Sequence, residues 1–169
     1  MTTRVFIGGS RRLGRLSRAV TDRLDRLMDR GHTVLIGDAH GVDKSVQQYL
    51  ASKDYRRVVV YCVADECRNN IGRWPTTAIQ APHSSRDFAY FAVKDVAMAR
   101  DATCGFMIWD GKSTGTLNNI LNVLHGDKAV LVYLIHTQEF YTLKGSHELR
   151  GLLNRCDPED VRGFSRALG

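Results

Sequence analysis

Long hydrophobic runs are missing from this sequence of 169 residues. No apolar stretch approaches the roughly 20 residues that a helix needs to span a bilayer. The N-terminal stretch MTTRVFIGGS lacks the pattern of a signal peptide, because its apolar part is too short. We therefore expect a cytoplasmic protein with no membrane partner.

Proline and cysteine are also scarce, with three and four residues. Together with a hydrophobic content of 43%, the low proline content is typical of a globular domain and argues against a disordered chain. The cysteines lack the paired spacing of a zinc site, so we expect no metal and no other cofactor. Cys62 and Cys104 lie in or beside apolar runs, which predicts buried free thiols.

A Walker-type phosphate loop is absent, although Gly111-Lys112-Ser113 matches the last part of one. The pattern G-x-x-x-x-G-K-[ST] requires a glycine at position 106. Phe106 stands there, inside a GFMIW stretch that is typical of a buried strand. The loop around Gly111 therefore needs another explanation.

Positive charge is what the sequence has in excess, with a net charge of +6. Arginines cluster between positions 11 and 30, where Asp22, Asp25 and Asp29 dilute them. A solvated helix face and a contact with a polyanion are both compatible with this pattern, and the excess charge attracts phosphate-bearing ligands in general. The arginines of this segment are Arg11, Arg12, Arg15, Arg18, Arg23, Arg26 and Arg30.

Apolar runs alternate with segments of helical periodicity along the chain. Buried parallel strands are predicted at 4–9, 32–37, 56–63, 104–109 and 129–135, with helices between them. The helix expected over about 85–100 carries Phe88, Ala92, Val96 and Ala99 on one face.

We therefore predict a single α/β, Rossmann-like domain over residues 1–169. Its parallel sheet should have about five strands in the order 3-2-1-4-5, with helices on both faces. Residues 64–85 are the longest expected loop, and residues 136–169 are expected to form a C-terminal helical extension. Ligands of such sheets bind at the carboxyl ends of the strands, so the loops after the first, second and fourth strands are the candidates.

These three loops are polar and contain glycine. Each joins a strand to a helix, where free N–H groups and the helix dipole attract anions. The first loop, GGSRR, departs from the G-x-G-x-x-G fingerprint, so an NAD site is unsupported. A role in starting the second helix and a ligand contact explain Asp43 equally well. The predicted ligand contacts are Gly8, Gly9, Ser10, Arg11, Asp38, Gly41, Asp43, Asp110, Gly111, Lys112, Ser113, Thr114, Gly115 and Thr116.

The stretches IGGSRRL, IGDAHGVDKSVQQYL and KDVAMARDATCGFMIWDGKSTGTLNNI, in that order, resemble the SLOG superfamily over about residues 4–135. This group includes the lonely-guy phosphoribohydrolases and the DNA-processing protein DprA. The resemblance implies a nucleotide-type ligand and a homodimer or higher homo-oligomer.

The resemblance also bears on single positions. Lonely-guy enzymes carry a catalytic glutamate where this sequence has Asn119, and a helix arginine where it has Lys94, followed by Asp95. Cleavage of an N-glycosidic bond develops oxocarbenium character that a carboxylate stabilises, and an asparagine brings no charge. Asp38, Asp95 or Asp110 are the possible replacements. The candidate catalytic residues are Asp38, Lys94, Asp95 and Asn119.

Three functions are open at this point. The first, favoured by the three loops and the missing glutamate, is a nucleotide-binding protein that acts as a sensor or sequestering module. The second is an N-glycosidase of the phosphoribohydrolase type that acts on a nucleoside monophosphate. The third is a DprA-like binder of single-stranded DNA. It is the least favoured, because the sequence does not interleave aromatic with basic residues for base stacking.

Overall fold

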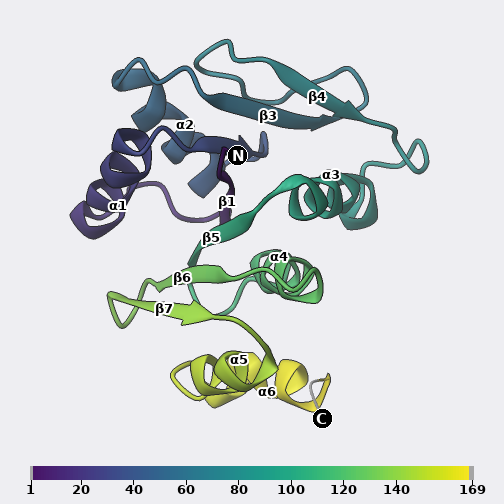
Figure 1. The fold of residues 1–169 in the computed structure, drawn as a ribbon. Helices are drawn as coiled ribbons and strands as arrows, with labels where there is room; N and C mark the ends of the chain where they lie inside the picture. Colours follow the sequence, from purple (N-terminus) through teal and green to yellow (C-terminus); the bar gives the residue numbers. More distant parts are fainter. Residues whose placement is uncertain (1, 168–169) are drawn as a thin grey trace.

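The computed structural model describes residues 2–167, with side chains up to residue 164, and has an α/β architecture in which helices flank one sheet (Figure 1). No helix in that range is long and apolar enough to cross a bilayer. The strands are β1 (Arg4–Gly9), β2 (Thr33–Ile36), β3 (Val58–Val63), β4 (Thr76–Ile79), β5 (Cys104–Trp109), β6 (Val130–Leu134) and β7 (Glu139–Leu143). The helices are α1 (Arg18–Asp29), α2 (Val42–Ser52), α3 (Phe88–Asp101), α4 (Thr114–His125), α5 (Ser146–Leu153) and α6 (Pro158–Ala167).

The sheet has seven strands in the order β4-β3-β2-β1-β5-β6-β7. All neighbouring strands are parallel except β6 and β7, so the sheet is mixed. Its centre is β3-β2-β1-β5-β6, built from the five apolar runs. The expected strand count and complete order were wrong, because each edge of the sheet carries a further strand.

Both missed strands lie in segments for which the sequence predicted a loop or helices. β4 falls in 64–85, the expected loop, and its four residues alternate between exposed and half-buried. β7 falls in 136–169 and exposes three of its five residues. Edge strands with one solvated face show such mixed patterns instead of continuous apolar runs. The C-terminal segment is therefore a strand followed by α5 and α6, and not a helical extension alone.

Helices cover both faces of the sheet (Figure 1). On one face, Val20 and Leu24 of α1 and Val46 of α2 join one apolar core cluster. On the other face, α3, α4 and α5 bury side chains such as Met98 and Ile120 in the second cluster. A buried parallel sheet needs this cover on both sides.

α3 turns only part of the expected face to the sheet, because Ala99 is buried as predicted but Ala92 is half-buried. Phe88 and Val96 are 56% and 55% exposed, whereas Tyr90 and Lys94 are buried. The carboxylate of Asp87 accepts a hydrogen bond of 3.0 Å from the N–H of Tyr90 and caps the helix, which starts at Phe88. The apolar pattern was misleading because the buried side of this helix includes a lysine.

A disulfide joins Cys62 and Cys67, so the expected free thiol at Cys62 was wrong. The chain turns back after β3 through Ala64, which has a φ of 56°, and this turn returns Cys67 to the end of the strand. Cys104 and Cys156 are the free cysteines, and Cys104 is half-buried instead of buried.

Candidate functional site

A cavity of about 450 Å³ opens at the carboxyl-terminal edge of the sheet, next to β1 and β5. These strands are neighbours in the sheet although α1, α2 and α3 separate them in sequence, and ligands of open α/β sheets bind at such a change in strand order. Of the predicted residues, Ser10, Asp38, Gly41 and Gly111 lie outside its lining. The predicted residues in the lining are Gly8, Gly9, Arg11, Asp43, Lys94, Asp95, Asp110, Lys112, Ser113, Thr114, Gly115, Thr116 and Asn119.

The buried Ser10 joins the first loop to the third. Its Oγ accepts a hydrogen bond of 3.1 Å from the N–H of Asp110 and lies 3.1 Å from the Oγ of Ser113. A Cβ at the neighbouring Gly9 would stand 2.3 Å from the carbonyl oxygen of Ile108, so only glycine fits there. The two loops therefore form one rigid unit.

Asp110 shapes the third loop. Its carboxylate accepts hydrogen bonds from the N–H groups of Lys112 and Ser113 at 2.9 and 2.8 Å, and from the Ser113 hydroxyl at 2.9 Å. Partial burial opposes ionisation, but these hydrogen bonds hold the pKa of Asp110 below its ordinary value. The ionised carboxylate therefore organises its own loop.

The first turn of α4 is open toward the cavity. Its N-cap residue Ser113 makes no side-chain capping bond, and the turn contains no acidic residue. The first N–H groups of a helix have no partner within the helix, and the helix dipole makes this end positive. Thr114, Gly115 and Thr116 line the cavity here, and a Cβ at Gly115 would have Phe88 as its nearest neighbour, at 3.7 Å. This end of the cavity suits an anionic group.

Three basic side chains also belong to the cavity, and the Nζ of one of them, Lys112, lies 4.0 Å from Oδ2 of Asp160. Arg11, Arg12 and Lys112 line the cavity and are exposed. Gly41, at a φ of 78°, sets the position of Arg11, because a Cβ there would stand 2.2 Å from the Arg11 carbonyl oxygen. Gly41 thus acts by bringing the second loop against the first.

The carboxylate of Asp38 binds Arg68, which was not among the predicted site residues. This carboxylate accepts hydrogen bonds from the backbone N–H and from the guanidinium of Arg68, at 2.9 and 2.7 Å. Burial opposes ionisation, but the hydrogen bonds and charge of Arg68, with the charge of Lys94, lower the pKa of Asp38. The carboxylate is already ionised and paired, so its contacts position the loop that carries Arg68.

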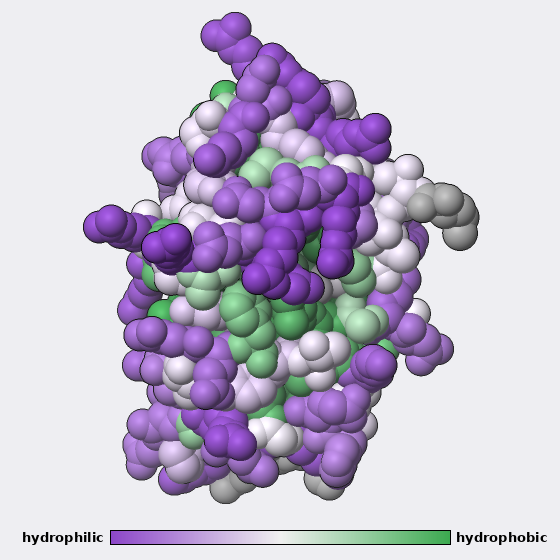
Figure 2. Space-filling model, turned by 60° about the vertical axis from the view of Figure 1, so that its left-hand side comes forward, coloured by the Kyte–Doolittle hydropathy of each residue, from purple (hydrophilic) through white to green (hydrophobic). Residues whose placement is uncertain are grey.

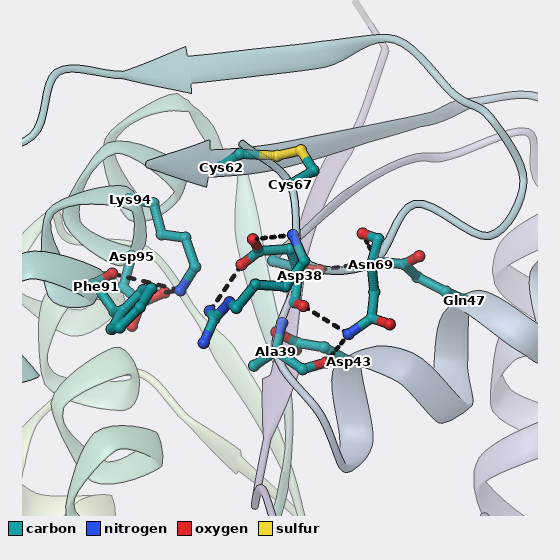
Figure 3. A network of polar contacts seen from close by, with 12 residues as sticks. Asp38, Ala39, Asp43, Gln47, Cys62, Cys67, Asn69, Phe91, Lys94 and Asp95 are labelled. Atoms are coloured by element: carbon teal, nitrogen blue, oxygen red, sulfur yellow. Dashed lines mark hydrogen bonds and ion pairs between the residues drawn. A yellow bond between two sulfur atoms is a disulfide. The ribbon is translucent and has the colours of Figure 1, made fainter. Parts of the chain in front are cut away.

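That loop lies outside the cavity lining and is bound to the residues that follow β2 (Figure 3). The side chain of Asn69 donates to the carbonyl oxygens of Asp38 and Ala39, at 2.8 and 3.3 Å. The buried Gln47 donates to the carbonyl oxygen of Asn69 at 3.2 Å. The polar run CRNN, which follows shortly after the predicted third strand, was the available signal, because the carboxyl end of that strand meets the same sheet edge.

The buried Lys94 and Asp43 and the half-buried Asp95 form a group of ionisable side chains on the cavity wall (Figure 3). The Nζ of Lys94 lies 3.1 Å from Oδ1 of Asp95, and the carboxylate of Asp43 accepts from the N–H of Ala39 at 3.2 Å. A Cβ at Gly37 would stand 2.7 Å from Oδ2 of Asp43, so glycine makes room for this group.

Burial dominates the protonation of both carboxyl groups. It raises the pKa of Asp43 to about 7, against the charge of Lys94 and with the help of the Asp95 charge. Burial also raises the pKa of Asp95, against the charge and hydrogen bond of Lys94. Asp43 therefore changes protonation near neutral pH, which is the range that suits a general acid or base.

Asn119 contributes an acceptor with no partner. Its side chain is 8% exposed and lines the cavity, and its Oδ1 has no hydrogen bond within residues 2–167. A buried polar atom without a partner is costly, and native structures contain few of them. A ligand that donates a hydrogen bond here would satisfy it.

Two phenylalanines of α3 complete the cavity, and both line it. Phe88 is 56% exposed, and Phe91 carries the guanidinium of Arg68 at 4.0 Å from its ring centroid. The exposed ring of Phe88 and the half-buried ring of Phe91 give a planar ligand a face on which to stack.

One group among the described residues has the composition of a metal site, namely Asp38, Cys62 and Cys67. Its two sulfur atoms are joined to each other, and its carboxylate is bound to Arg68. The donors are therefore engaged with protein groups, and we assign no metal to them.

No protein-family model matches this chain, and the comparison with curated proteins gives no significant match.

Proposed function

We propose that the protein binds a nucleotide or a nucleotide-derived small molecule in this cavity and acts as a sensor or sequestering module. The observation that carries the proposal is the pairing of an open helix terminus with an aromatic wall in one cavity of about 450 Å³. That volume lies within the range of about 300–1,000 Å³ typical of small-molecule sites. We also propose membership of the SLOG superfamily, on the motifs of the three loops.

The phosphate of the ligand lies at the start of α4 in this proposal. The N–H groups of Thr114, Gly115 and Thr116 are the donors, and Arg11 and Lys112 supply charge. Each of these groups favours an anion, and all of them line the same cavity.

The rest of the ligand extends toward α3. The base stacks on Phe88 or Phe91, and a sugar hydroxyl or exocyclic amine donates to Oδ1 of Asn119. The cavity thus offers an anion site, an apolar face and an unused acceptor, which together match the parts of a nucleotide.

Calorimetry tests the proposal with AMP, GMP, CMP, UMP and ADP-ribose as probes. We expect at least one to bind the wild type and to lose at least about tenfold in affinity in Gly115→Asp, because the new carboxylate repels the phosphate. Gly151→Asp is the matched control, since nothing lies within 4 Å of that position on α5. Folded protein that binds none of the probes contradicts the proposal.

A second candidate function is N-glycosidic cleavage of the bound nucleotide, favoured by the two carboxyl groups of Asp43 and Asp95 that line the cavity with Lys94. In this reaction water adds to C1′, the C1′–N bond breaks, and the proton lost by water is returned to the leaving base. Asp43, whose pKa is about 7, suits the proton transfer, and Asp95, which lies 3.1 Å from Nζ of Lys94, suits the oxocarbenium charge when it is ionised.

Chromatography of the free base tests the second candidate. It requires base release from a nucleoside monophosphate that Asp43→Asn and Asp95→Asn each abolish while calorimetry still detects binding. If the wild type binds the nucleotide but releases no base over hours, the protein binds without hydrolysis.

A further inference from the structure

A second cavity, of about 290 Å³, lies near the amino-terminal ends of β1 and β5, on the face of the sheet that carries α1. Its apolar floor comes from Val5, Phe106 and Leu131. The parallel strands β1 and β5 run from this cavity toward the first one. The two sites therefore lie at opposite ends of these strands.

The rim of this cavity is cationic. Arg23, Arg26 and Arg30 line it, and they follow one another at spacings of three and four residues along one side of α1 and its C-cap. None of the three forms an ion pair with another described residue, whereas Arg18 of the same helix pairs with Asp22 at 3.9 Å. Their charges are available to a bound anion.

The floor begins at the buried Val5 of β1, beside α1, and extends to the half-buried Leu131 of β6, where no helix of residues 2–167 covers the sheet. α1 and α2 lie over β1, β2 and β3, and the same face of β6 and β7 is open (Figure 1). Phe140 of β7 is 39% exposed, with its ring centroid 4.9 Å from that of Tyr133. Figure 2 brings this side forward and shows hydrophobic residues gathered beneath a band of hydrophilic ones. An uncovered apolar face on a largely parallel sheet marks a binding surface.

We propose that this cavity binds a medium-chain aliphatic carboxylate, with its head at the arginines and its chain on the apolar floor. The carboxylate complements three unpaired guanidinium groups, which bind carboxylates with bidentate geometry. The volume lies at the lower limit of ligand pockets, about 300 Å³, and accommodates a small ligand only.

The free thiol of Cys104 provides a local reporter, because it lines the same cavity and is half-buried. A bound chain shields it from alkylation. Cys156 is buried and Cys62 is bonded to Cys67, so neither competes for the reagent to the same extent.

Calorimetric titration of the full chain with decanoate, below its micelle concentration, tests the proposal. We expect decanoate to bind at least about tenfold more tightly than decanol, and to slow alkylation of Cys104 by iodoacetamide as read by peptide mass spectrometry. Equal affinity for decanoate and decanol overturns the proposal, and so does the absence of decanoate binding.

Variants locate the site. Arg26→Gln/Arg30→Gln should weaken decanoate binding at least about tenfold and remove the protection of Cys104. Arg18→Gln is the matched control on the same helix and should bind as the wild type does, because the Arg18 side chain is 93% exposed and outside the cavity. Undiminished decanoate affinity in the double variant, with folding verified by circular dichroism, also overturns the proposal.

Discussion

The hydroxyl oxygens of Ser10 and Ser113 lie 3.1 Å apart, although 103 residues separate them in the sequence. Ser10 follows β1 and Ser113 precedes α4, so this contact fixes the first glycine loop against the helix terminus proposed to bind phosphate. The Oγ of Ser10 also accepts from the N–H of Asp110. One buried side chain thus holds together the two loops on which the proposed site depends.

Ser10→Ala should therefore destabilise the protein more than the loss of an exposed serine hydroxyl does. The N–H of Asp110 would lose its partner, which costs about 1–3 kcal/mol in the free energy of unfolding. Urea denaturation measures the change. Ser52→Ala is the control, because its hydroxyl makes an exposed local bond, and a similar loss in both variants contradicts the assigned role.

The raised pKa of Asp43 predicts how stability depends on pH. Its carboxyl binds a proton more tightly in the folded than in the unfolded protein, so its contribution to the free energy of unfolding falls as the pH rises from about 4 to about 7. Asp43→Asn removes this contribution.

The stability of Asp43→Asn relative to the wild type should consequently increase across that pH range. Urea denaturation at about pH 4.5, 5.5, 6.5 and 7.5, values that cover most of the interval between the ordinary pKa of 3.8 and the raised pKa of about 7, measures the difference. A constant difference shows that Asp43 has an ordinary pKa.

Removal of the Arg68 side chain should be costly because it leaves the buried carboxylate of Asp38 without its ion-pair partner and with only the backbone hydrogen bond from residue 68. The side chain of Asp38 is 3% exposed and that of Arg68 22%, and breaking such a pair costs about 3 kcal/mol. Arg68→Ala should show this loss in urea denaturation, and Asp38→Asn/Arg68→Leu should recover part of it.

The matched control for Arg68 is Arg56→Ala. Arg56 pairs with Asp54 at 2.9 Å, but both side chains are more than 70% exposed, so the expected loss is below about 1 kcal/mol. Equal losses at the two arginines would show that the pair with Asp38 does not stabilise the fold.

The disulfide between Cys62 and Cys67 should stabilise the fold modestly. It closes a short loop, with a sequence separation of 5, and loop-closure entropy gives about 2 kcal/mol. A dithiol reductant should lower the urea midpoint of the wild type and leave that of Cys62→Ala/Cys67→Ala unchanged. A wild-type midpoint that ignores the reductant contradicts the prediction.

The central strands could be predicted because burial on both faces requires continuous apolar residues, as in RVFIGG of β1 and CGFMIW of β5. β4 and β7 could not be predicted in this way. They are edge strands with exposed positions, and their pairing with β3 and β6 is decided by contacts across the sheet that periodicity does not encode.

The parts of the candidate site that consist of short glycine-containing loops could be predicted from the sequence. Gly9 ends β1 and Gly115 lies in the first turn of α4, and the topology brings both to one cavity. Arg68 was missed because it sits in an aperiodic segment, and its role comes from the buried Asp38, 30 residues earlier. The burial of Lys94 was also unpredictable, since a buried lysine needs carboxylate partners and only Asp95 is its neighbour in sequence, whereas Asp38 and Asp43 come from elsewhere in the fold.

The most direct test of the proposed nucleotide site is mass spectrometry of the small molecules released when purified protein is denatured. Wild type, Gly115→Asp and the control Gly151→Asp are prepared in parallel. The proposal predicts a phosphate-bearing nucleotide from the wild type and the control, and little or none from Gly115→Asp. Equal amounts of nucleotide from all three proteins would contradict it, because the ligand would then not depend on the start of α4.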